Sequence, residues 1–204
     1  HYYHRRGITS YSATQYNGWT SLNRVNSENE GEMAIGPNIT SIAANAIYGT
    51  AIERVTSANA TKLTSAYFNK ASKLKVIDLS GCTALRTISQ GFLKTLSALE
   101  TLILPHGLTT LASQALRSTG ASKCTYVRLP DTVTSIQGLA FSQTSATLFN
   151  YVDFGNTRTT VPSLANSNAF TYSGNKNIII PDALYDSGEW ASATNWSNST
   201  IVAK

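Results

Sequence analysis

The sequence predicts a mostly β solenoid of stacked coils, and the main evidence is one internal repeat. Residues 99–116 align with residues 124–141 when the chain is shifted along itself. Apolar residues recur at the same offsets in both segments, and each segment has a proline directly after its strand-like leucine. Self-similarity at a period of about 20 to 50 residues is the signature of stacked repeats. Each repeat is therefore expected to form one coil.

The composition is that of a folded chain with few charges. Of the 204 residues, 42% are hydrophobic and 13% are charged, which excludes a disordered class. The formal net charge is +5, and the basic residues are scattered singly between Arg54 and Arg128. A solvated basic flank is the simpler interpretation, and a polyanion site is the alternative. No nucleic-acid partner is predicted, and no apolar run approaches the length of a membrane span.

Residues 1–29 do not fit the repeat, and we expect them to form an N-terminal capping or linker segment. Several aromatic residues lie in this segment among serines, threonines and glycines. The end of a solenoid exposes apolar side chains that need a cover, and aromatic rings bury a large area. A metal or polyanion site at His1, His4, Arg5 and Arg6 is the alternative, although two histidines lack a third ligand nearby. Because the sequence starts at His1, it reads as a piece of a longer chain.

About seven coils are predicted over residues 30–181, with their main strands in one parallel sheet in chain order. A further apolar residue, such as Ile136 or Val161, follows most main strands by about seven positions. Residues 163–168 are an insertion in the sixth coil, which we expect to bulge from one flank as a loop. The last inward residues of the main strands are Ile35, Ser57, Leu79, Leu104, Leu129, Phe154 and Ile180.

Residues 182–204 are predicted to form a C-terminal cap. Trp190 and Trp196 are expected to lie over the open end of the last coil, and Asp182 is expected to start the segment that carries them. The two cysteines are expected to be buried thiols, because Cys82 and Cys124 lie two coils apart. Coils stack at about 4.8 Å, so two steps exceed the reach of a disulfide.

The third coil indicates which kind of repeat this is. Residues 74–82, Leu-Lys-Val-Ile-Asp-Leu-Ser-Gly-Cys, match the leucine-rich pattern L-x-x-L-x-L-x-x-N/C. Residues 129–136, Leu-Pro-Asp-Thr-Val-Thr-Ser-Ile, and Ile180-Pro-Asp resemble the repeat unit of the BspA-type leucine-rich repeats. The departures are Ser57 at an inward position and the missing proline after Ser57, Leu79 and Phe154.

This resemblance implies an α/β-type leucine-rich-repeat solenoid with right-handed coils. The parallel sheet would line the concave face, and short or helical turns would lie on the convex side. The family is associated with bacterial cell surfaces and phage-borne proteins that bind host or matrix components, and it is not known for catalysis. The resemblance thus implies an extracellular or cell-surface module, monomeric within a longer chain, that binds a protein or glycan.

The chemistry of the chain points to no enzyme, no cofactor and no metal site. The histidines are His1, His4 and His106, and none has matched ligand spacing. No phosphate-binding glycine loop or nucleophile elbow occurs. A hydrolase built from the N-terminal segment and the concave face would lack a nucleophile with a base.

The candidate binding residues lie on the outer face of the sheet, because side chains alternate along a strand. One row contains Tyr126 and Tyr151 on adjacent coils, and the other contains Arg128 and Asp153. These pairs form either a binding patch or a cross-strand ladder that stabilises the coils without any ligand. The full candidate set is Arg54, Thr101, Ile103, Tyr126, Arg128, Tyr151 and Asp153.

Two functions are therefore considered. The first is non-catalytic recognition of a protein or glycan on a host or matrix surface. The second is an architectural spacer in a larger surface protein or in a phage tail fibre.

Overall fold

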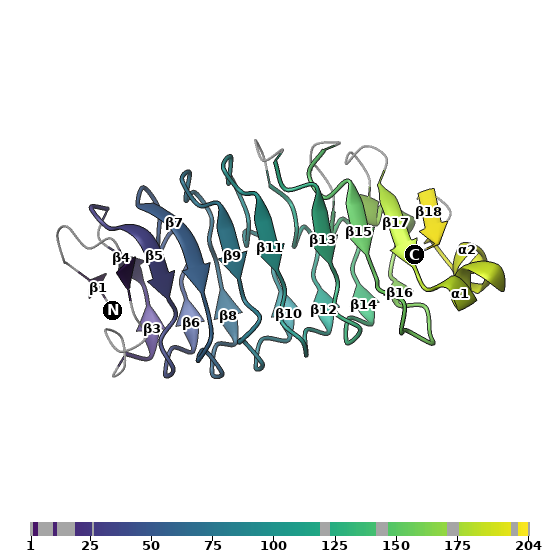
Figure 1. Ribbon diagram of the computed structural model, residues 1–204, viewed down its shortest axis with the longest axis horizontal. Coiled ribbons are helices and arrows are strands. Elements are labelled where there is room, and N and C mark those ends of the chain that lie inside the picture. The colour runs from purple at the N-terminus through teal and green to yellow at the C-terminus, as the bar shows by residue number, and fades with distance from the viewer. Residues whose placement is uncertain are drawn as a thin grey trace.

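The chain forms one mostly β solenoid of about seven coils, as the repeat predicts (Figure 1). This computed structural model describes residues 2–3, 10–11, 19–25, 27–118, 123–141, 147–170, 176–196 and 200–203. Most coils contribute one strand to a main sheet and a shorter strand to one of two small sheets. The prediction of a leucine-rich-repeat solenoid is confirmed.

The main sheet has nine strands, and every pairing in it is parallel. The strands follow one another in chain order, so the predicted topology is also confirmed. The strands are β2 (Ser10–Tyr11), β5 (Glu30–Ala34), β7 (Ala51–Thr56), β9 (Val76–Asp78), β11 (Thr101–Ile103), β13 (Tyr126–Arg128), β15 (Tyr151–Asp153), β17 (Asn177–Ile180) and β18 (Thr200–Ala203).

Two-residue strands form shorter parallel sheets elsewhere on the coils. The first small sheet is β3 (Ser21–Leu22), β6 (Ser41–Ile42) and β8 (Ser65–Ala66). The second is β10 (Thr87–Ile88), β12 (Thr110–Leu111), β14 (Ser135–Ile136) and β16 (Ser163–Leu164). At the N-terminal end, β1 (Tyr2–Tyr3) pairs with β4 (Arg24–Val25).

The sixth coil differs from the prediction. Residues 163–168 do not simply form a loop, because Ser163 and Leu164 pair in register with Ser135 and Ile136 of the previous coil. Leu164 is buried, whereas Val161, the expected inward residue, is only partly buried. The extra length therefore lies before β16, and a 3-10 helix, η2 (Ser167–Phe170), follows it.

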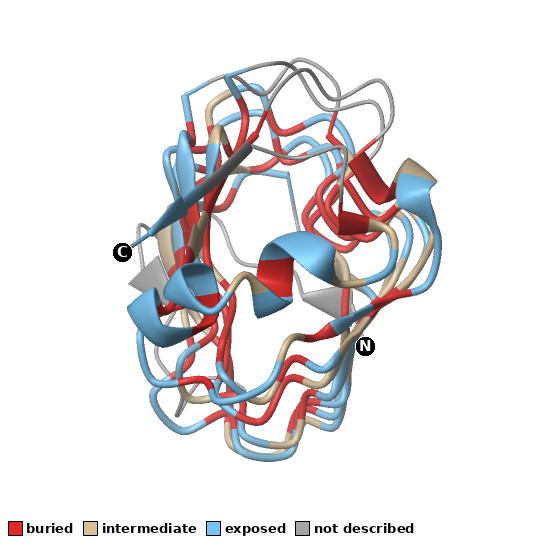
Figure 2. Cartoon of the chain, turned by 90° about the vertical axis from the view of Figure 1, so that its right-hand side faces the viewer, coloured by how far each residue is buried: buried red, intermediate tan, exposed pale blue. Residues whose placement is uncertain are grey.

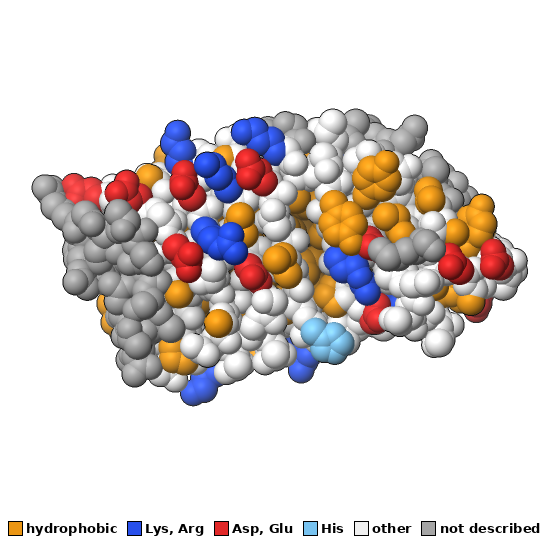
Figure 3. Space-filling view, viewed as in Figure 1, with side chains coloured by type: hydrophobic (Ala, Val, Ile, Leu, Met, Phe, Trp, Pro, Cys, Tyr) orange, Lys and Arg blue, Asp and Glu red, His pale blue; other side chains and the backbone are white. Residues whose placement is uncertain are grey.

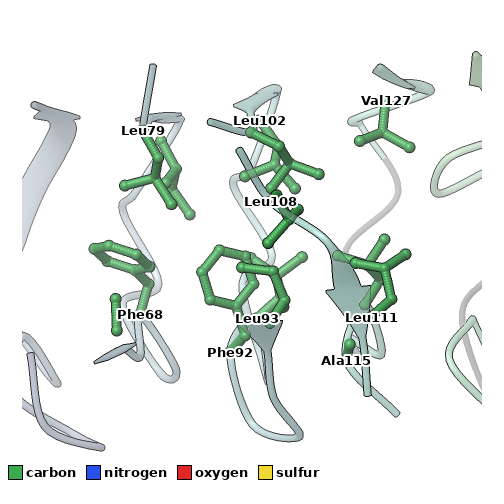
Figure 4. Packing of buried hydrophobic residues seen from close by; sticks show 14 of the residues in the cluster. Phe68, Leu79, Phe92, Leu93, Leu102, Leu108, Leu111, Ala115 and Val127 are labelled. Carbon is green, nitrogen blue, oxygen red and sulfur yellow. The ribbon is translucent and has the colours of Figure 1, made fainter. Parts of the chain in front are cut away.

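Apolar side chains from all sides of each coil fill the interior. Seen from the C-terminal end, buried and exposed residues alternate along each coil, on all of its sides (Figure 2). In the central coils, Leu79, Leu102 and Val127 stand in a row from the main sheet, with Phe68 and Phe92 below them (Figure 4). Burial of such side chains is the main favourable term in folding.

Ser57 shows how a polar residue is accommodated at an inward position. Its side chain is 2% exposed, and its Oγ accepts a hydrogen bond from the backbone N–H of Gly81 at 3.1 Å. A Cβ on Gly81 would approach the Ser57 carbonyl oxygen to 1.8 Å. The turn of the third coil therefore needs glycine, and this glycine satisfies the buried hydroxyl of the second coil.

Both cysteines are buried free thiols, as predicted. Burial raises the pKa of Cys82 and of Cys124 to about 11, so both thiols stay protonated at neutral pH.

At the C-terminal end, α1 (Asp182–Asp186) and α2 (Glu189–Ser192) lie across the coil stack (Figure 2). The rings of Trp190 and Trp196 are buried, with centroids 4.9 and 5.6 Å from that of Phe154 in the sixth coil. After the helices, β18 adds one more strand to the main sheet. The boundaries of the two capping segments stay predictions, and His1, His4, Arg5 and Arg6 lie outside the described residues.

No helix among the described residues has the length and apolar character needed to cross a membrane.

Leu129 tests the placement of the core, because its side chain has no exposed surface. We expect Leu129→Ala to lower the free energy of unfolding by about 2 to 5 kcal/mol, through lost burial and the cavity left behind. Hydrogen exchange should rise mainly in the fourth to sixth coils, because coils stabilise their neighbours. The control is Ser97→Ala at an exposed position, which should change stability by less than about 0.5 kcal/mol. Equal losses in the two variants would contradict this core.

Candidate binding surface

The outward residues of the main sheet form the two rows that the sequence predicts. Tyr126 lies opposite Tyr151, and Arg128 lies opposite Asp153. On the preceding strand, Ile103 lies opposite Arg128. Hydrophobic side chains gather over the C-terminal half of this face, and charged side chains of both signs mark its N-terminal half (Figure 3).

Three of these apolar side chains are strongly exposed. Ile103 is 40% exposed, Tyr126 46% and Tyr151 44%, and they lie on the adjacent strands β11, β13 and β15. We call this group the apolar patch. Exposed aromatic residues of this kind commonly anchor protein partners.

Asp153 differs from the expectation, because its side chain has no exposed surface. Its carboxylate accepts hydrogen bonds from the Tyr126 hydroxyl and from the backbone N–H of Gly155, the latter at 2.7 Å. Burial, together with the hydrogen bond to Asp153 and its charge, raises the pKa of Tyr126 to about 12. Asp153 is therefore no direct contact for a ligand; it holds the Tyr126 ring in place.

The contacts of Arg128 are not those expected of a simple cross-strand ladder with Asp153. Its Nη2 lies 3.0 Å from Oδ1 of Asp131, and its Nη1 donates to the Leu129 carbonyl. The guanidinium lies against Gly155, where a Cβ would come within 2.2 Å of Nη2. Arg128 is thus held against the turns that follow β13 and β15, and part of its donor capacity is already used.

Asp131 joins this region to the sixth coil. It accepts a hydrogen bond from Thr157, and Nε of the buried Arg158 lies 4.0 Å from Oδ1. Burial alone would raise the pKa of Asp131, but the hydrogen bonds from Thr157 and Arg128 and the two guanidinium charges together hold this pKa below its ordinary value.

A hollow of about 320 Å³ opens in the main sheet between β11 and β13. These two strands share a single register pair, whereas β9 and β11, and likewise β13 and β15, share three. The hollow is lined by Glu100, Thr101, Leu102, Ile103, Leu104, Tyr126 and Arg128.

The floor of the hollow is the core itself. Leu102 and Leu104 are 5% and 6% exposed, whereas Val127 and Leu129, at the same positions one coil later, have no exposed surface. Leu102 and Leu104 are thus buried but keep a small exposed fraction beside the apolar patch. Exposed apolar surface of this kind marks interaction sites.

Cys124 is a small residue in a row of large inward ones. Leucine occupies the equivalent positions 74 and 99, and phenylalanine occupies position 149. The Cys124 sulfur lies 3.5 Å from the Tyr126 carbonyl oxygen. Cys124 is buried and does not line the hollow, so no residue pattern in the sequence marks the hollow.

The two remaining candidate residues, Thr101 and Arg54, lie in different parts of the main sheet. Thr101 lines the hollow, so the structure brings it beside Ile103 and Tyr126. Arg54 lies on β7, two strands before β11, and its Nε is 3.9 Å from Oε2 of Glu32. Neither the period nor the alternation of side chains marks Glu100, Leu102 and Leu104 as residues that line a hollow.

In the described part of the chain, no three His, Cys, Asp or Glu side chains are grouped so that they could hold a metal ion.

Comparison with known proteins identifies the repeat. The sequence matches the family model of the BspA type leucine rich repeat region, in six copies, over residues 25–121 and 119–203. One similar solved structure is a leucine rich cell surface protein from Faecalibacterium prausnitzii A2-165, with 19% identity and a TM-score of 0.38. That match covers 90% of this chain and 66% of the other, just under two thirds of its length. No curated protein matches the sequence.

Asp131 provides a test of the contacts that hold Arg128. We expect Asp131→Asn to lower the free energy of unfolding at pH 7 by up to about 1 kcal/mol, since the carboxylate is partly exposed and screened. The pKa of Asp131 is lower in the folded state, so its contribution is present above the unfolded-state pKa and is lost as the pH falls through the folded-state pKa. Thermal unfolding should therefore separate the variant from the parent at pH 7 but not at about pH 2. An equal difference at both pH values would contradict this role.

Proposed function

Because the chain belongs to the BspA-type leucine-rich repeat family, we propose that it is a non-catalytic recognition module that binds a protein or glycan outside the cell. The family's association with cell-surface and phage-borne proteins supports the extracellular location. The observation that carries the proposal is the hollow between β11 and β13, together with the apolar patch at its rim.

Apolar surface that the hollow leaves in water costs free energy. Closed pairing of β11 with β13 would bury Leu102 and Leu104 as fully as the equivalent leucine and valine of the next coil. Each 10 Å² of apolar surface left in water costs roughly 0.25 kcal/mol. A ligand that covers the hollow and contacts Ile103, Tyr126 and Tyr151 recovers this free energy on binding.

The arrangement also favours a preorganised site. The Tyr126 hydroxyl is bonded to the buried Asp153, and Arg128 is bonded to Asp131. Side chains that are already fixed lose little conformational entropy when a ligand binds. A rigid aromatic rim around an apolar floor is suited to an apolar side chain or to the flat face of a sugar.

The test is the double variant Ile103→Ala with Tyr151→Ala. Neither substitution removes the hydrogen bond between Tyr126 and Asp153, so the fold should persist. Ligands would be sought on an array of glycans and a panel of purified extracellular matrix proteins, and affinities measured for each ligand found. We expect the double variant to bind at least about tenfold more weakly than the parent, which corresponds to about 1.4 kcal/mol.

The matched control is Tyr185→Ala with Val202→Ala, which removes one tyrosine and one aliphatic side chain of similar exposure, 48% and 41%, away from the apolar patch. The control should bind as the parent does. If the patch variant also binds as the parent does, the patch is not the binding site. A chain that binds none of these ligands would favour the architectural spacer.

A further inference from the structure

We infer that the hollow between β11 and β13 binds the acetamido group of an N-acetylated amino sugar, an inference that rests on the proposed function because it names the ligand of the same site. The sugar ring would lie on the apolar patch. Three features of the described residues favour this ligand: two backbone groups that are not joined across the hollow, a floor with little exposed apolar surface, and an aromatic rim.

The ladder between β11 and β13 is interrupted at the hollow. Ile103 lies opposite Arg128. Two residues earlier, a continuous ladder would place Thr101 opposite Tyr126, yet β11 and β13 do not form that register pair. The strand pairs on either side, β9 with β11 and β13 with β15, do pair at this level. Backbone groups that the neighbouring coils join are therefore separated here.

The separated groups are the Tyr126 N–H and the Glu100 carbonyl. On the following strand pair, the corresponding N–H of Tyr151 donates to the Thr125 carbonyl at 2.9 Å. Among the described residues no such bond crosses the hollow, and no donor bonds the Glu100 carbonyl oxygen. The Tyr126 N–H is left with the sulfur of Cys124, which is a weak acceptor. A ligand with a donor and an acceptor can satisfy both groups.

The geometry of a parallel sheet indicates which ligand group does so. Backbone N–H and C=O groups lie in the plane of a sheet and point to the neighbouring strand. A group held between Tyr126 and Glu100 therefore meets a donor on the β13 side and an acceptor on the β11 side. A secondary amide in its trans form has its oxygen and its N–H on opposite sides. One such amide can thus bond both backbone groups at once.

The floor of the hollow favours an amide that ends in a methyl group. Leu102 and Leu104 keep only a small exposed fraction, which offers enough apolar surface for a methyl but little for a branched or aromatic side chain. The core lies beneath these leucines, so a chain cannot continue past them. A peptide amide continues through a Cα atom on both sides, whereas an acetamido group ends in its methyl. The floor therefore favours the sugar over the backbone of a protein partner.

The rim of the hollow offers contacts for the sugar ring itself. The rings of Tyr126 and Tyr151 are exposed on adjacent strands, and the bond to Asp153 holds the first of them in place. The exposed face of an aromatic ring can pack against the C–H face of a sugar. The Glu100 carboxylate and the Thr101 hydroxyl are exposed and make no side-chain bond within the described ranges. Both can accept hydrogen bonds from sugar hydroxyls.

The test compares sugars that differ at the acetamido group. The probes are the trimer of N-acetylglucosamine and the methyl glycoside of N-acetylgalactosamine. Their controls are cellotriose and methyl galactoside, which carry a hydroxyl in place of the acetamido group. We expect at least one probe to bind about tenfold or more tightly than its control, or about 1.4 kcal/mol, because the control leaves the amide-binding groups unpaired.

Backbone amide NMR locates the bound sugar. In the free protein, the Tyr126 N–H should exchange with solvent faster than the Tyr151 N–H, which is bonded to the Thr125 carbonyl. Binding of the probe should shift the Tyr126 N–H proton signal downfield and slow its exchange, whereas the exchange of the Tyr151 N–H should stay unchanged. The double variant Ile103→Ala with Tyr151→Ala should bind the probe more weakly than the parent does.

The outcomes separate this ligand from the proposed function. Equal affinity for each probe and its control, or a bound probe that leaves the Tyr126 N–H unchanged, would overturn the acetamido site. A parent chain that binds neither probe but binds a matrix protein through the apolar patch would overturn it as well, and would leave the proposed function standing. If the Tyr185→Ala, Val202→Ala control loses as much probe affinity as the patch variant, the sugar does not bind at the patch.

Discussion

The structure depends on one constraint, the stacking of each coil on its neighbours in parallel register. A single coil cannot bury its own apolar side chains, so each strand of the main sheet needs the strands beside it, and each inward leucine needs those above and below. The same register that builds the core also aligns the outward residues into rows. Tyr126 lies opposite Tyr151, for example, because Val127 and Val152 pack at the same depth inside. The surface properties of this protein are therefore consequences of its repeat.

The period and the alternation of side chains are sufficient to predict the main strands within residues 30–181, their order and both outward rows. They do not predict β2, β3 and β18, which join the sheets from the two segments expected to be caps. They are not sufficient where a side chain at an outward position is buried, or where a coil has extra length. Asp153 occupies an outward position by alternation, yet the Tyr126 hydroxyl and the turn at Gly155 bury it. Leu164 replaces Val161 in the second sheet because the sixth coil has extra length before β16, which only the pairing with β14 reveals. The hollow between β11 and β13 could not be predicted, because it accompanies the short pairing of these two strands, which share one register pair, rather than any pattern of polarity.

The outward residues of the main sheet mostly stabilise the stack. Neighbouring coils combine opposite charges or join aromatic rings, and both arrangements are favourable by themselves. The hollow departs from this pattern, because Leu102 and Leu104 at its floor keep a small exposed fraction that the equivalent residues of the next coil lack. We regard this departure as the place where the surface is adapted to a partner.

The central claim is that a small molecule can reach two core leucines, Leu102 and Leu104, through the hollow beside Tyr126. Methyl-labelled leucine NMR during a titration with phenol, a small aromatic probe, tests this claim most directly. The account predicts that phenol shifts the methyl signals of Leu102 and Leu104, while those of Leu79 and Leu129, which have no exposed surface, stay unchanged. Unchanged signals for Leu102 and Leu104, or equal shifts in all four leucines, would contradict it.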